Sequence, residues 1–129
     1  MDFHYTVTSS KNIDETIESI TQNLKMKKFG VLWQLDLPAK LLEKGVDSYT
    51  SAYHILEVCN PEEAAQVLNH NQLIGYFLPC KIVVYESEGV TKIGLPKPTA
   101  LIGLLNEPEL NTIAENIEEI LIDALNKSI

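Results

Sequence analysis

The residues Ser87 to Gly89 predict a tight turn between two strand-like segments, and this turn limits the folds that the chain can adopt. CKIVVYE (80–86) precedes the turn, and VTKIGL (90–95) follows it. Both segments are rich in β-branched residues, and a short glycine-containing turn between two such segments predicts a β-hairpin. A hairpin pairs its strands antiparallel, since a parallel pair needs a crossover of a dozen or more residues. We therefore expect an antiparallel sheet.

Three earlier segments complete the predicted sheet. DFHYTVT (2–8) alternates apolar and polar residues, as a half-buried strand does. VLWQLDL (31–37) and YHILEVC (53–59) are predicted as the second and third strands. Together with the hairpin, these segments give about five strands.

Two long helices flank the strands. Asn12 and Glu15 form a capping-box pattern before an apolar repeat that continues to about Met26. At the other end of the chain, apolar residues recur at i, i+3 and i+4 from Pro108 to about Asn126. Each pattern predicts an amphipathic helix with one apolar face for the sheet.

Shorter elements lie between the strands. One short helix is predicted from Pro38 to Leu42. Another is predicted after Asn60, which can act as the N-cap, with Glu63 completing a second capping box. The apolar segment TALIGLLNE (99–107) contains a glycine and is predicted as a loop that packs on the rest of the protein.

The order of these elements predicts a single α+β domain over residues 1–129. A strand and a long helix come first, a four-strand meander with short inserted helices follows, and a long helix closes the chain. This order is typical of an antiparallel sheet with both long helices on one face. The 129 residues are 45% hydrophobic, which is enough for one continuous core.

Charge and hydropathy exclude several classes of function. The net charge is −8, and all ten basic residues are lysine, so the chain has no guanidinium for bidentate contacts with phosphate or guanine. We therefore expect no nucleic-acid partner. No apolar run approaches the roughly 20 residues needed to cross a bilayer, and the N-terminal MDFHYTVTSS lacks the pattern of a secretory signal. We expect a cytoplasmic protein with no membrane partner.

The longest motifs resemble the family catalogued as domain of unknown function 302. KKFGVLWQLDLPAKLLEKG, ILEVCNP followed by EEAAQVL, GYFLPCKIVVYE and ELNTIAENIEEILIDAL match its pattern over nearly the whole chain. The resemblance implies an α+β fold similar to that of the TATA-box-binding protein. It implies no activity, and similarity of fold would not carry DNA binding to so acidic a chain.

Strand alternation assigns the residues of the predicted sheet to two faces. The face under the helices is predicted to hold Phe3, Tyr5, Val7, Val31, Trp33, Leu35, Leu56, Val58, Val83, Tyr85 and Ile93. The second face is predicted to hold His4, Thr6, Leu32, Gln34, Asp36, Tyr53, Ile55, Glu57, Cys59, Cys80, Ile82, Val84, Glu86 and Lys92. The second face mixes apolar and charged residues, so it needs a cover. A second copy of the chain, as a homodimer, is one cover. A small, partly apolar ligand with PKPTALIGLL (96–105) as a flap is the other.

The two cysteines are expected at one end of this second face, if the third and fourth strands are antiparallel neighbours. A ligand site is predicted there, formed by Cys59, Cys80, Glu57, Leu32, Ile55 and Ile82.

Three functions are compatible with this site. The first is the binding of a small ligand or a protein partner. The second is a thiol-dependent enzyme or redox sensor in which Cys59 attacks, Cys80 resolves and Glu57 accepts a proton; the helix that starts at Pro61 could lower the pKa of Cys59. The third is a structural dimer module, with the cysteines as small packed residues. No metal site is expected, because two cysteines are too few and no C-x-x-C or H-x-x-x-H spacing occurs. The sequence names no cofactor and leaves open whether the protein is an enzyme.

Overall fold

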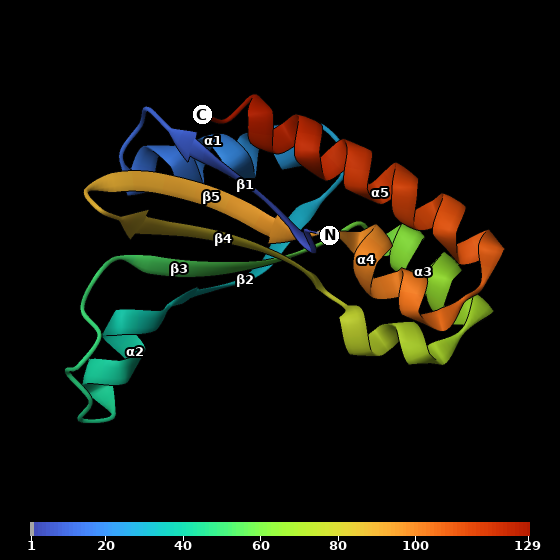
Figure 1. Cartoon of the computed structure of the whole chain (residues 1–129), viewed down its shortest axis with the longest axis horizontal. Helices are drawn as coiled ribbons and strands as arrows, with labels where there is room; N and C mark the ends of the chain where they lie inside the picture. The colour runs from blue at the N-terminus through green and yellow to red at the C-terminus, as the bar shows by residue number, and fades with distance from the viewer. Residues whose placement is uncertain (1) are drawn as a thin grey trace.

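A computed structural model, which describes residues 2–129, confirms the α+β fold with a five-stranded antiparallel sheet (Figure 1). The strands are β1 (His4–Ser9), β2 (Gly30–Asp36), β3 (Tyr53–Cys59), β4 (Cys80–Ser87) and β5 (Val90–Pro96). The helices are α1 (Ile13–Lys25), α2 (Leu37–Glu43), α3 (Pro61–His70), α4 (Pro98–Ile102) and α5 (Pro108–Asn126), with 3-10 helices η1 (Gln72–Phe77) and η2 (Gly103–Leu105). The spatial order β1-β5-β4-β3-β2 makes β2 to β5 a meander, and β1 pairs with β5 at its far edge.

The hairpin between β4 and β5 is closed by a two-residue turn. Ser87 pairs with Val90, and the residues between them, Glu88 and Gly89, have φ angles of 53° and 79°. Positive φ at both central residues is the type I′ geometry, whose twist matches that of the flanking strands. The predicted hairpin is confirmed.

Helix ends follow the predicted capping residues, with one difference. The Asn12 side chain accepts a hydrogen bond from the Glu15 amide (2.8 Å), and the Asn12 amide donates to Glu15 Oε1 (3.3 Å). The Asn60 side chain accepts from the amides of Glu62 and Glu63 (3.1 and 3.3 Å). Within residues 2–129, Glu63 does not return a bond to the Asn60 amide, so the second capping box is only half formed.

The segment predicted as a loop after Pro98 is helical instead. Pro98 suits the first turn of a helix, and Ile102 is buried against α5, so tertiary packing stabilises α4 despite its short sequence signal. The amide and hydroxyl of Thr99 donate to Glu118 Oε1 of α5 at 3.1 and 2.7 Å. The expectation that this segment packs on the protein is confirmed.

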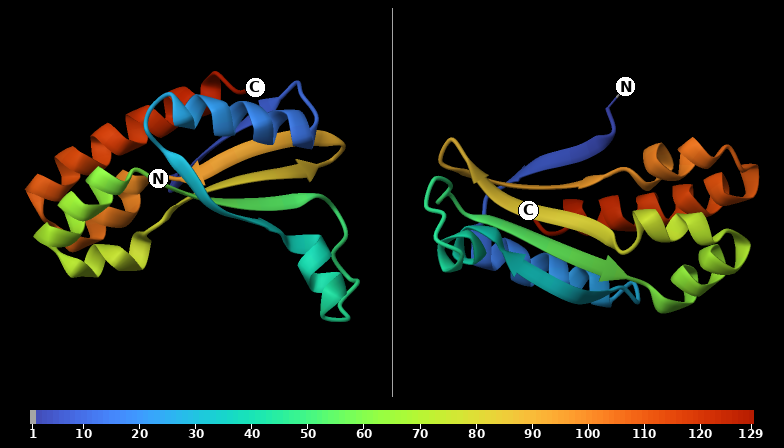
Figure 2. Two further views of the ribbon diagram at one scale, coloured as in Figure 1. Left: turned by 180° about the vertical axis from the view of Figure 1, so that it is seen from behind. Right: turned by 90° about the horizontal axis from the view of Figure 1, so that it is seen from below.

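Both long helices cover one face of the sheet, as predicted (Figure 2). The main core joins α1 and α5 to the sheet through Ile20, Leu24, Leu56, Val58, Ile82, Val84, Ile93, Leu95, Ile117, Leu121 and Leu125. A second cluster joins α3, η1 and α4 to the first half of α5 through Val67, Ile74, Ile102, Leu110 and Ala114. None of the helices in residues 2–129 combines the length and apolar character that spanning a bilayer requires.

The predicted faces are wrong for β4 and for the part of β2 that follows Val31. Ile82 pairs with Leu56, and Ile82 and Val84 are fully buried under the helices, so Val83 and Tyr85 lie on the opposite, open face. Ile82, Val83 and Val84 are all apolar, so the sequence pattern does not show which of them face the helices.

In β2, a bulge between Val31 and Trp33 reverses the alternation. Val31 faces the helices, whereas Trp33 (52% exposed) and Leu35 lie on the open face beside Glu57 and Ile55.

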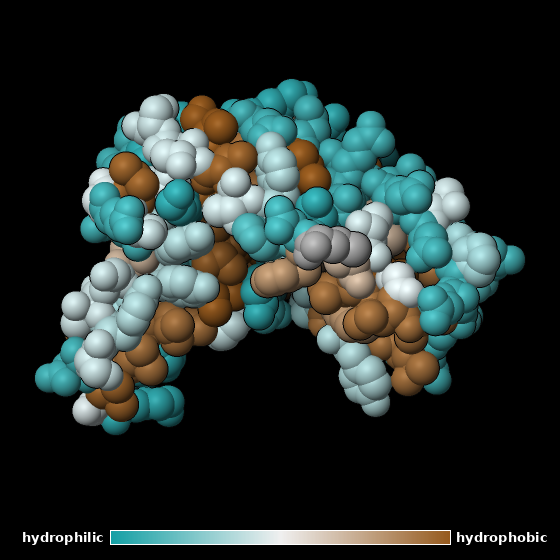
Figure 3. Space-filling view, in the orientation of Figure 1, coloured by the Kyte–Doolittle hydropathy of each residue, from teal (hydrophilic) through white to brown (hydrophobic). Residues whose placement is uncertain are grey.

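Two projections frame the open face of the sheet. α2 extends from one end of the sheet and η1 from the other, both away from the layer formed by α1 and α5 (Figure 1). The space-filling view shows a hollow between them with apolar atoms on both flanks (Figure 3).

Candidate functional site

The β4–β5 hairpin opens into a fork at its far end. The two strands pair from Ser87 with Val90 as far as Val83 with Gly94. Beyond that point β4 stays with β3, through Ile82 and Leu56, while β5 stays with β1, through Leu95 and Tyr5. Pro96 has no amide hydrogen to donate across the fork. The strands therefore diverge toward η1 and α4 (Figure 2).

A cavity of about 390 Å³ lies in this fork, which we call the fork cavity. Its apolar walls come from α3, η1, α4 and α5 and from the prolines beside the two strands: Val67, Ile74, Phe77, Leu78, Pro79, Pro96, Pro98, Leu101, Ile102, Ile117 and Leu121. Its polar lining consists of Glu57, Tyr76, Cys80 and Lys81. The volume falls within the roughly 300–1,000 Å³ of typical small-molecule sites. The cavity can thus hold an apolar group with polar contacts at one side.

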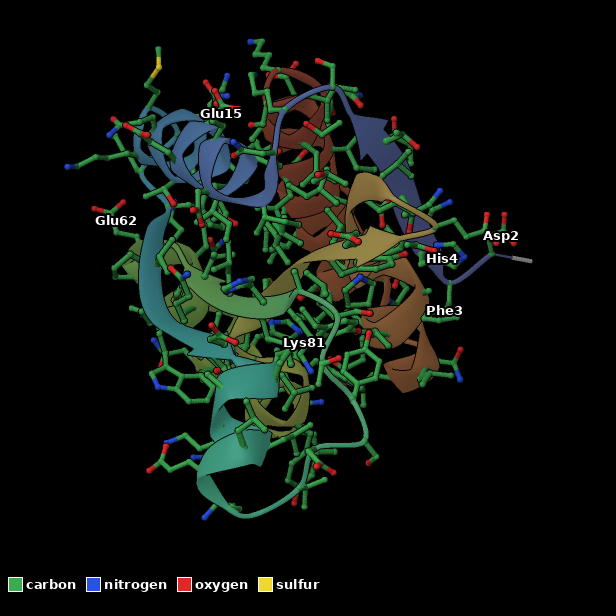
Figure 4. All side chains as sticks on the ribbon, turned by 90° about the vertical axis from the view of Figure 1, so that its left-hand side faces the viewer. Asp2, Phe3, His4, Glu15, Glu62 and Lys81 are labelled. Carbon is green, nitrogen blue, oxygen red and sulfur yellow. The ribbon has the colours of Figure 1, made fainter. Side chains whose placement is uncertain are left out.

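Two opposite charges lie side by side at the solvent side of the fork cavity. Glu57 of β3 and Lys81 of β4 are direct register partners; Lys81 is exposed and Glu57 half-buried. Figure 4 shows the Lys81 side chain on the side of the sheet away from α1. In the part of the chain that the structure describes, neither side chain takes part in an ion pair.

The cysteines lie at the same end of the sheet, but Cys80 is not on the open face. Cys80 pairs with Val58 and packs against the main core, whereas Cys59 takes the next position along β3 and pairs with Gly30. Both cysteines are free thiols. Together with Phe29, Val67 and Ile117 they line a crevice of about 20 Å³, which has room for one water molecule at most.

The thiol pKa values are raised, which is opposite to the expected effect of the α3 N-terminus on Cys59. Loss of hydration on burial raises the pKa of Cys59. Burial, with smaller contributions from the charges of Cys59 and Glu63, raises the pKa of Cys80 to about 11. At pH 7, about one Cys80 in 10⁴ is then a thiolate. Both thiols are poor nucleophiles at neutral pH.

The structure brings together only some of the predicted site residues. Glu57 and Cys80 line the fork cavity, and Cys59 lines the adjoining crevice. Leu32 is 61% exposed at the β2 bulge, and Ile55 lies on the open face beside Val83; neither lines the fork cavity. Ile82 is fully buried under the helices, so its placement on the open face was wrong.

Sequence reasoning missed Lys81 and the walls from η1. Lys81 was missed because the predicted alternation along β4 places it under the helices and not on the open face. Phe77 belongs to a 3-10 helix whose position depends on contacts far along the chain. The prolines at 79, 96 and 98 were a usable signal, because all three line the fork cavity. No group of three or more metal-ligating side chains occurs within residues 2–129.

Comparisons with known proteins agree with the fold. A family model described as domain of unknown function DUF302 matches residues 5–128. No curated protein matches the chain. A crystal structure of an uncharacterized conserved protein DUF302 from Bacillus stearothermophilus is similar, with 54% sequence identity, a TM-score of 0.94 and 98% of each chain covered.

Proposed function

Because the chain belongs to the DUF302 family, whose description gives no function, we propose a function from the site: the protein is a small cytosolic protein that binds a small, partly apolar molecule in the fork cavity. The observation that carries this proposal is the fork cavity, with apolar walls deep in the fork and charged groups at its solvent side.

The size of the fork cavity supports the proposal. The fork cavity is open to solvent at one side and is not an enclosed void. A cavity of about 390 Å³ is more than ten times a water's share of liquid volume, about 30 Å³. Its apolar walls would hold water poorly, so an apolar molecule that displaces the water gains free energy from burial.

The segment that the sequence analysis proposes as a flap supplies one wall of the fork cavity. Pro96, Pro98, Leu101 and Ile102 belong to the segment PKPTALIGLL and line one side of the fork cavity. The segment is joined to α5 through buried Ile102 and through the two hydrogen bonds of Thr99. We propose that α4 remains in place as a wall and that the ligand enters from the open face of the sheet.

An NMR titration with hexan-1-ol tests the proposal. Saturable shifts are expected at the amides of Phe77, Cys80, Lys81 and Leu101, and Leu101→Trp, which fills the fork cavity, abolishes them. Leu104→Trp is the matched control, because Leu104 is 71% exposed nearby and does not line the fork cavity. Shifts that are absent, or that persist in Leu101→Trp, would count against binding in the fork.

A homodimer through the open face is a second candidate. Leu32, Trp33 and Leu42 around β2 and α2 are 61%, 52% and 55% exposed, an apolar group that a second copy could cover. Trp33→Glu tests this interface, because Trp33 is exposed and a charge there leaves the fold intact. A charge at Ile82 would not be a useful test, because Ile82 is fully buried and the variant would unfold. Sedimentation at several concentrations should show a dimer that Trp33→Glu dissociates. A monomer throughout, or a dimer that resists the substitution, would exclude this interface.

A further inference from the structure

From the unpaired charges Glu57 and Lys81, we infer that the ligand of the fork cavity is a small zwitterion with an apolar tail, such as an apolar α-amino acid. The inference rests on the proposed function and adds the chemical class of the ligand. It assigns the ligand's ammonium group to Glu57, its carboxylate to Lys81 and its tail to the apolar walls.

The register places the two charges for such a ligand. Side chains directly opposite each other on antiparallel strands have Cβ atoms about 4.5–5.5 Å apart, and opposite charges at such positions usually attract each other. Glu57 and Lys81 are opposite in this sense and both line the fork cavity. Glu57 and Lys81 form neither this pair nor any other ion pair within residues 2–129, so a ligand that carries both charges can supply the contact that each of them lacks.

The sign pattern selects against ligands with a single charge. A carboxylate alone would be attracted to Lys81 and repelled by Glu57, and an ammonium group alone would meet the reverse. Only a ligand with both charges side by side gains from both residues. Glu57 is half-buried, so its electrostatic interactions are screened less than those of an exposed carboxylate.

The rest of the lining suits an uncharged tail. Phe77, Leu101 and Ile102 present only hydrocarbon, and the Cys80 thiol is neutral at pH 7. Among the residues that line the fork cavity, Glu57 and Lys81 are the only groups charged at neutral pH. The tail is therefore expected to be aliphatic or aromatic, without further charge.

Calorimetric titration with four six-carbon probes tests the inference: norleucine, hexanoate, hexylamine and hexan-1-ol. Norleucine, the zwitterion, should bind about tenfold more tightly than hexanoate or hexylamine. Glu57→Gln and Lys81→Met should each weaken norleucine about three- to tenfold, as expected for one charged contact at a partly exposed site, and leave hexan-1-ol unchanged. Lys92→Met is the control, because Lys92 lies on the open face outside the fork cavity and its loss should change nothing.

The outcomes separate the two proposals. If hexan-1-ol or hexanoate binds as tightly as norleucine, and Leu101→Trp blocks that binding, the zwitterion inference fails while binding in the fork stands. If no probe binds, both fail. If Lys92→Met weakens norleucine as much as Lys81→Met does, the charge effect is general and the assignment of Lys81 is overturned.

Discussion

Gly94 lies at the point where the β4–β5 hairpin opens, and replacing it with alanine should destabilise the protein. It is the last β5 residue paired with β4, and it also pairs with Thr6 of β1. A Cβ atom at Gly94 would lie 2.6 Å from Thr6 Oγ1, 2.8 Å from the Tyr5 carbonyl oxygen and 3.2 Å from Thr6 Cα. The threonine hydroxyl could rotate away, but the carbonyl and Cα belong to the paired backbone of β1. Backbone must therefore move to admit one methyl group.

Overpacking of this kind costs about 1–3 kcal/mol. For a chain of 129 residues, each kcal/mol lowers the melting temperature by about 4 °C, so Gly94→Ala should melt about 4–12 °C below the wild type. Urea denaturation should give the same loss in the free energy of unfolding with an unchanged slope, because one added methyl group hardly changes the surface exposed on unfolding. Adding Thr6→Ala should restore only part of the loss, since the contact with the Tyr5 carbonyl remains.

Gly30→Ala is the matched control. Gly30 is also a strand glycine, but a Cβ atom there meets nothing within 4 Å. Alanine restricts the unfolded chain more than glycine does, so this variant should be unchanged or slightly more stable. Equal stability of Gly94→Ala and Gly30→Ala would refute the close approach of β1 and β5 at this position.

Three other predictions test the packing, the thiols and the helix cap. Ile82→Ala should lose about 2–5 kcal/mol of the free energy of unfolding and Val83→Ala much less; a larger loss at Val83 would restore the original face assignment. Cys80 should react slowly with iodoacetamide at pH 7 and faster as the pH rises toward its pKa of about 11. Rapid labelling at pH 7 would instead support a thiol-dependent enzyme or redox sensor. Asn12→Ala should cost about 1 kcal/mol in urea denaturation, because it removes the side-chain oxygen that accepts from the Glu15 amide, and no loss would contradict that geometry.

The raised pKa of Cys80 also predicts how the free energy of unfolding changes with pH. Above pH 9 the unfolded chain releases the thiol proton while the native chain keeps it, so the free energy of unfolding falls between pH 9 and about 11. The loss from Cys80 is at most about 3 kcal/mol, and Cys80→Ala should flatten this part of the curve. A curve that is the same in both proteins would mean that Cys80 is not shielded from water.

The order of elements could be predicted from sequence because its signals are local. Asn12 caps α1, Pro108 begins α5, and the turn after Ser87 requires only the residues within it. The helical segment after Pro98 was missed because its stability comes from burial of Ile102 against α5, which the segment itself does not encode.

The candidate site was harder to predict because it depends on pairing between distant strands. The predicted face of Ile82 was wrong because its neighbours are apolar on both sides, and only the register with Leu56 sets the phase. The fork arises because Leu95 pairs with Tyr5, far along the chain, rather than with β4. Glu57 and Cys80 were identified near the site, but for Cys80 the expected role as a reactive thiol conflicts with the effect of burial on its pKa.

The most direct test of the central claim is a crystal structure of the unlabelled protein, from crystals grown in the presence of free selenomethionine as a ligand. Selenomethionine is itself a zwitterion with an apolar tail. The anomalous signal of selenium should form one peak in the fork cavity, between Phe77 and Leu101, with the ligand's head group in contact with Glu57 and Lys81. A fork cavity without that peak at saturating selenomethionine, or selenium bound only elsewhere on the protein, would contradict the account.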